Sequence, residues 1–108
     1  MIVTTTDSVD GTRIGSYLGI VSGDAVLGTN VFKDLFASVR DIIGGRSASY
    51  ERLLQDGKEQ ALADMIARAK DLGADAVIGV DLDYQVIGGD NKTMLMVCVN
   101  GTAVTLGS

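Results

Sequence analysis

The chain has 108 residues, of which 9 are Lys or Arg and 14 are Asp or Glu, so its formal net charge is −5. It contains no His and a single Cys. This excludes catalytic pairs that need an imidazole, disulfides within one chain, and zinc sites of the usual Cys and His type. The acidic pI of about 4.4 disfavours a nucleic-acid partner, because phosphates are bound by clustered Lys and Arg.

A chain of this length forms one domain, which we take as residues 1–108. The longest apolar run, residues 94–99, is far shorter than the roughly 20 residues that span a bilayer. The N-terminus has no basic region followed by an apolar stretch, so we expect no signal peptide, no membrane partner and a cytoplasmic location. A mean hydropathy of +0.27 is high for a small soluble monomer and indicates apolar surface buried between subunits.

The first quarter of the chain predicts two strands. Residues 2–6 are short and β-branched, which favours a strand, and the polar residues 7–15 with two glycines predict a loop. Residues 17–27 predict a second strand. Gly19 and Gly23 lie on the same face of that strand, where missing side chains permit a bend or the close approach of another backbone.

Two helices are predicted next. Asn30 is a suitable N-cap for a helix to residue 43, which Gly44 and Gly45 end. Ser47 then caps a longer helix to residue 72, with Gly73 at its C-terminal cap position. Apolar residues recur at helical spacing along one face of this second helix: Tyr50, Leu53, Leu54, Ala61, Met65, Ile66, Ala69 and Leu72.

After Gly73 the apolar period changes to two. Residues 76–86 predict a half-buried strand, residues 88–91 a hairpin loop, and residues 93–105 the return strand. The return strand is apolar on both faces, with Met94, Met96 and Cys98 on one and Leu95, Val97 and Val99 on the other. A helical layer covers only one face of a sheet, so burial of the second face predicts a homo-oligomer.

Several segments in order resemble the YbjQ-like family of small bacterial and archaeal proteins: GIVSG at 19–23, GTNVF at 28–32, RDIIGGRS at 40–47, YE at 50–51, LGADAVIGVDLDY at 72–84 and GTAV at 101–104. The resemblance implies an α+β subunit of β-β-α-α-β-β order, in which helices cover one face of an antiparallel sheet related to the dodecin arrangement. It also implies assembly as a homopentameric ring and carries a heavy-metal-binding label, with no established enzymatic activity.

The turn formed by Gly44, Gly45, Arg46 and Ser47 is one candidate ligand site. The glycines let the backbone curve, the helix N-terminus after Ser47 favours anions, and Arg46 with Arg40 adds positive charge. A small anion, a phosphate or an enzymatic substrate would suit such a site. The alternative is a helix–turn–helix corner whose arginines form ion pairs.

Two further groups are candidate metal ligands. The side chains of Asp81 and Asp83 point the same way on one strand, with their Cα atoms about 7 Å apart. A ring would gather such pairs into a girdle of carboxylates that suits Ca²⁺ or Mg²⁺. Met94, Met96 and Cys98 offer three sulfur atoms that would suit Cu(I). The alternatives are a solvated strand face for the aspartates and core or interface packing for the sulfur residues.

No basic side chain is placed to activate a Ser or Thr nucleophile. We therefore expect a non-enzymatic homo-oligomer, a pentamer by the resemblance, that binds a small ligand or an ion. The cofactor is unknown.

Overall fold

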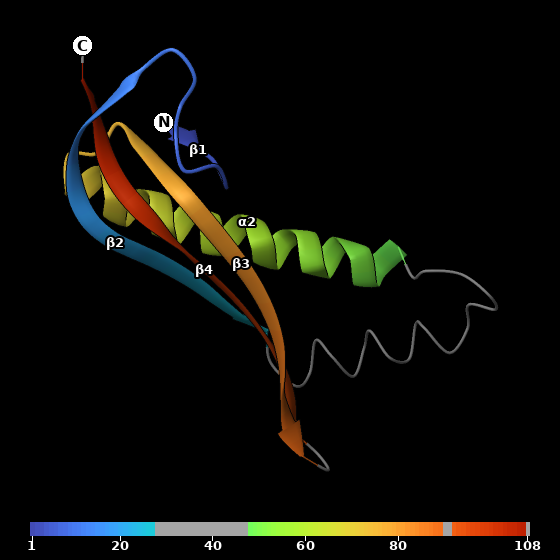
Figure 1. Cartoon of the computed structure of the whole chain (residues 1–108). Helices are drawn as coiled ribbons and strands as arrows, with labels where there is room; N and C mark the ends of the chain where they lie inside the picture. The colour runs from blue at the N-terminus through green and yellow to red at the C-terminus, as the bar shows by residue number, and fades with distance from the viewer. Residues whose placement is uncertain (28–47, 90–91, 108) are drawn as a thin grey trace.

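A computed structural model describes residues 1–27, 48–89 and 92–107 (Figure 1). The described chain is an α+β fold with elements in the order β1 (Ile2–Val3), β2 (Arg13–Leu27), α2 (Ala48–Asp71), β3 (Ala76–Gly89) and β4 (Lys92–Gly107). The helix predicted at residues 30–43 lies outside the described residues. The predicted long helix and the predicted hairpin are confirmed, and all three long strands extend beyond their predicted bounds.

The four strands form one sheet in the order β1-β3-β4-β2. β4 pairs antiparallel with both β2 and β3, whereas β1 pairs parallel with β3 through Ile2 and Ala76. The sheet is therefore mixed, and the expectation of a purely antiparallel sheet is wrong at β1. A parallel neighbour requires a long crossover connection, which here contains β2 and α2.

A bulge in β3 holds the N-terminal segment beyond β1. Gly79 has φ 61°, and the register of β3 against β4 shifts between Ile78 and Asp81. The backbone N–H of Gly79 donates to the Thr6 carbonyl at 2.8 Å, and that of Val80 donates to the Thr4 carbonyl at 3.1 Å. The predicted strand 2–6 is thus reduced to two residues, followed by a loop that the bulge anchors.

The helix α2 ends as its sequence predicts. Gly73 adopts the left-handed conformation at φ 83°, and its N–H donates to the Lys70 carbonyl at 2.9 Å. The Ala74 N–H donates to the Ala69 carbonyl at 3.1 Å, which satisfies another carbonyl of the last turn. The chain then enters β3 directly.

The core lies between α2 and one face of the sheet, across which the helix runs (Figure 1). Its buried residues are Val21 and Ala25 of β2, Ala61, Met65 and Ala69 of α2, Val77 of β3, and Leu95, Val97, Val99 and Ala103 of β4. The helix contributes mostly alanines, so it lies close to the sheet. Leu72, predicted on the buried face, is instead 49% exposed, because it follows the last helical residue, Asp71, and lies beyond the buried Ala69.

Gly23 marks the closest approach of β2 to α2. A Cβ at this position would lie 2.6 Å from the Met65 backbone nitrogen and would also collide with the Ala61 carbonyl oxygen. The prediction that a glycine of this strand permits close approach of another backbone is therefore confirmed at Gly23. Gly19, at φ 131°, has open space around it and lies at a register shift between β2 and β4.

Candidate functional site

The sheet surface opposite α2, here called the outer face, carries both groups of candidate metal ligands. On this face Asp81 lies opposite Asn100, and Asp83 lies opposite Cys98. Met96 and Met94 follow along β4, opposite Gln85 and Ile87. The oxygen and sulfur candidates, treated separately in the sequence, are thus neighbours on adjacent strands.

A third aspartate joins them from β2. Asp24 is the register partner of Cys98 on the side away from Asp83, so the thiol lies between two carboxylate residues in one cross-strand row. In the next row, Asn100 lies between Ser22 and Asp81. The period-two pattern of residues 17–27 could have placed Asp24 on one face of its strand. It could not show that β2 pairs with β4, which brings this residue to the site.

We call these two rows the carboxylate belt: Ser22, Asp24, Asp81, Asp83, Cys98 and Asn100. All except the half-buried Cys98 are exposed. Cys98 is a free thiol. Asp81 and Asp83 lie about 7 Å apart along β3, and Asp24 lies two strands, or about 10 Å, from Asp83, so the three exposed carboxylates repel one another weakly in a chain that is already acidic. A cation or a basic group brought to the belt would relieve this repulsion.

Apolar side chains flank the belt at both ends. Tyr17 is 72% exposed and Ile20 is 84% exposed on one side; Val26 at 57%, Ile87 at 42% and Met94 at 36% lie on the other. The expectation that β4 is apolar on both faces holds for residues 94–99. Asn100 and Thr102 then interrupt the apolar outer face, which resumes at the buried Val104, packed with Ala76 and Ile78 of β3.

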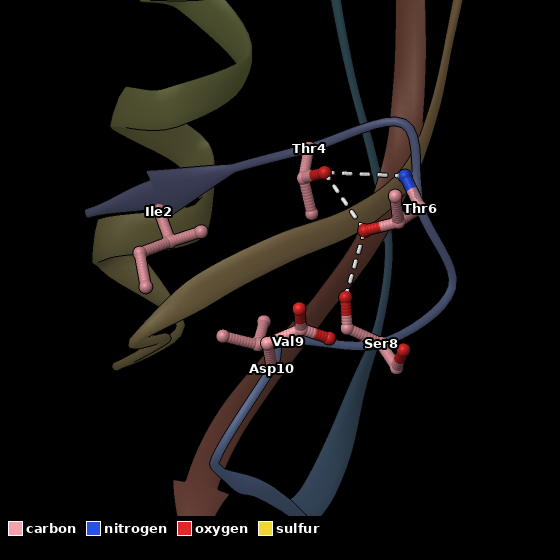
Figure 2. Close-up of a pocket in the computed structure, with 6 residues that line it drawn as sticks. All are labelled: Ile2, Thr4, Thr6, Ser8, Val9 and Asp10. Carbon is pink, nitrogen blue, oxygen red and sulfur yellow. Dashed lines mark hydrogen bonds between the residues drawn. The ribbon is translucent and has the colours of Figure 1, made fainter.

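A pocket of about 300 Å³ lies beside the β1–β2 connection (Figure 2). It is lined by Ile2, Thr4, Thr6, Ser8, Val9 and Asp10. The Thr6 hydroxyl donates to the Ser8 carbonyl at 2.7 Å and accepts from the Thr4 hydroxyl at 2.8 Å, while the Thr6 N–H donates to the Thr4 hydroxyl oxygen at 3.2 Å. The threonine hydroxyl protons are thus used within the loop itself.

A second pocket, of about 250 Å³, lies between α2 and the β1–β3 side of the sheet. Its walls are mainly aliphatic, and Lys58 supplies its one charged group; the lining is Val3, Thr4, Thr5, Lys58, Leu62, Val80 and Leu82. It forms because the buried face of α2 lies chiefly over β2 and β4. The helix therefore leaves part of β3 uncovered.

The anion candidates Arg40, Gly44, Gly45, Arg46 and Ser47 lie outside the described residues. In the part of the chain that the structure describes, no helix is long and apolar enough to cross a membrane.

Comparison with known families agrees with the fold. Residues 1–107 match the YbjQ_1 family model, whose description reads "Putative heavy-metal-binding". The chain belongs to the YbjQ family. It also resembles the crystal structure of a DUF74-family protein of unknown function from Pediococcus pentosaceus, with a TM-score of 0.61 and 18% identity over 99% of this chain and 98% of that one. At that identity the likeness shows the fold alone.

The YbjQ family description can be compared with the donors on the outer face. Heavy metals of soft character prefer thiolate and thioether ligands, and this chain offers Cys98 with Met96 and Met94 nearby. Across residues 1–27, 48–89 and 92–107, no three His, Cys, Asp or Glu side chains come together to hold a metal ion. The described part of one copy therefore does not form a heavy-metal site from these residue types.

Proposed function

We propose that this YbjQ-family protein is a non-enzymatic, cytoplasmic homo-oligomer, a pentameric ring, that holds a small ligand or an ion where its outer faces meet other copies. The observation that carries the proposal is the outer face itself. Two exposed apolar areas flank an exposed belt of carboxylates, and within the described residues no helix covers either.

The apolar areas support self-association. Ile20 at 84% exposed and Tyr17 at 72% exposed are large side chains left in water on a sheet face, a position in which such residues usually contact a partner. Burial of apolar surface stabilises association by roughly 25 cal/mol per Å² before its entropic cost is subtracted. A ring made of head-to-tail contacts would let every copy cover part of this surface.

The carboxylate belt supports a cation rather than an anion as the ligand. Assembly would bring several belts of Asp24, Asp81 and Asp83 near one another, which costs free energy unless a positive charge is bound between them. Oxygen donors of this kind suit hard divalent ions such as Ca²⁺ or Mg²⁺. A second copy could supply the ligands that one copy lacks.

Assembly is tested by sedimentation equilibrium at micromolar concentration. We expect the wild type at about 56 kDa, five times the 11.2 kDa of one chain. Ile20→Asp and Val26→Asp place charges in the two apolar areas and should shift the mass to that of one chain while the circular dichroism spectrum stays unchanged. Leu72→Asp is the matched control, since Leu72 is also exposed (49%) but lies at the end of α2. A monomeric wild type would disprove the proposal.

Cation binding is tested by calorimetric titration with Ca²⁺, Mg²⁺, Zn²⁺ and Cu(I). We expect binding of a hard ion that Asp83→Asn weakens by at least about tenfold, since removal of a residue that merely orients a metal ligand already costs that much. Cys98→Ala, in the same cross-strand row, should leave that affinity unchanged. If only Cu(I) gives binding heat, and Cys98→Ala abolishes it, the metal site is a sulfur site instead. If no ion gives binding heat, the proposal of metal binding is wrong.

A further inference from the structure

β2 is an edge strand of the described sheet, since it pairs only with β4. Register shifts interrupt its first half, between Ile14 and Ser16 and between Tyr17 and Gly19. From residue 20 to residue 27 the pairing with β4 is continuous. Bulges disfavour strand addition at an edge, so the second half of β2 is the part that another strand could join.

The sequence of the second half of β2 favours pairing with a strand of another chain, which would lead to aggregation. Residues 20–27 read IVSGDAVL, with a single charged residue, Asp24, and with Ile20 and Val26 largely exposed. Short segments of high β-propensity and low charge pair readily with another chain when their backbone groups are free.

Two side chains of α2 occupy this edge. The Asp24 backbone N–H donates to Oδ2 of Asp64 at 3.3 Å. Nη1 of Arg68 donates to the Ser22 carbonyl at 3.0 Å and lies 3.4 Å from the Ser22 hydroxyl. Asp64 and Arg68, one helical turn apart, also form an ion pair at 3.6 Å.

The bonded backbone groups are those that a new strand would need. In a β-strand, the N–H and the C=O of one residue project to the same side, and successive residues alternate. The Ser22 carbonyl and the Asp24 N–H both meet α2 rather than β4, so they belong to the free edge. Asp64 supplies an acceptor and Arg68 a donor, which are the two roles that a neighbouring strand would play.

Gly23 brings the helix within reach. Because it has no side chain, the backbone of β2 passes directly against α2 between the two bonded residues. The short Asp64 side chain can therefore contact the strand edge.

We propose that Asp64 and Arg68 guard the edge of β2 and prevent a strand of a second copy from adding there. The proposal concerns regulation of the self-assembly proposed above: with this edge closed, copies associate through the outer face and not by open-ended strand pairing. Asp64 and Arg68, here called the guard residues, would close the edge of β2 in the same way if the protein were a monomer.

The test removes both guard residues and compares the result with a matched pair. Asp64→Ala with Arg68→Ala is expected to form species larger than the wild type, which grow with concentration in sedimentation velocity and raise thioflavin T fluorescence several-fold. Arg52→Ala with Asp56→Ala is the control: these residues have the same types and spacing on the same helix and are exposed. The control should behave as the wild type does.

Adding Ser22→Pro to the guard variant should abolish the new species, because proline at an edge removes an N–H that no internal pairing uses. A folded guard variant with the wild-type mass distribution would overturn the proposal, as would large species that persist with Ser22→Pro. If the double variant does not fold, Arg68→Ala alone is tested in its place, with the same measurements and the same expected increase in large species. A monomeric wild type would refute the proposed ring and leave this comparison intact.

Discussion

Gly23→Ala is expected to destabilise the fold by about 3 kcal/mol or more, the upper range for overpacking a tight contact. The added Cβ would collide with the Ala61 carbonyl and lie 2.6 Å from the Met65 nitrogen and 3.1 Å from the Met65 Cβ. Most of these are backbone atoms of α2, which cannot turn aside as a side chain can. The helix would have to move away from the sheet. Urea denaturation measures the loss of unfolding free energy.

The control for this prediction is Gly73→Ala, which changes another glycine without any collision. Gly73 has φ 83° and no atom within 4 Å of a built Cβ, so its substitution costs only the backbone strain of about 1–2 kcal/mol. A Gly23→Ala variant that loses less stability than Gly73→Ala would show that α2 does not approach β2 as closely as described. Displacement of the helix should also release the guard contacts of Asp64 and Arg68 with the same strand.

Met65→Ala is expected to lower the unfolding free energy by about 3 kcal/mol, within the range measured for buried methionines. Met65 is fully buried and is the largest side chain that α2 places in the core. The other fully buried residues of α2 in this core are Ala61 and Ala69, whose side chains are too short to fill the cavity. Thermal and urea denaturation both report the change.

Leu72→Ala serves as the matched truncation on the same helix. Leu72 is 49% exposed beyond the edge of the core, so its removal should change the unfolding free energy by less than about 0.5 kcal/mol. If Met65→Ala and Leu72→Ala lowered the unfolding free energy equally, the predicted apolar face of the helix, which includes both residues, would be buried along its whole length.

Much of the local structure could be predicted because it depends on neighbours in the chain. The period of two in residues 76–86 predicted β3, and Gly73 predicted the end of α2 through its left-handed conformation. The close approach at Gly23 was also predicted, since a missing side chain on a strand leaves room for another backbone. Each of these signals acts over a few residues.

The candidate site could be predicted only in part. The shared direction of Asp81 and Asp83 follows from the alternation of side chains along one strand. The bulge at Gly79 was not foreseen, because a single glycine in a strand pattern does not say which backbone groups will leave the ladder. The position of Asp24 beside Cys98 was missed because it depends on how two distant strands are paired.

The amino-acid sequence by itself determined the long helix and the three long strands that the structure describes, the helix end, the excess of apolar surface and the family. Only the tertiary structure decided that β1 pairs parallel with β3, that three aspartates and one thiol lie in adjacent rows, and that Asp64 and Arg68 reach the edge of β2. The physical reason is range. Periodicity and turn preferences are encoded within a few residues, whereas strand order and helix-to-edge contacts join segments about 40 or more residues apart, for which a single sequence carries no direct signal.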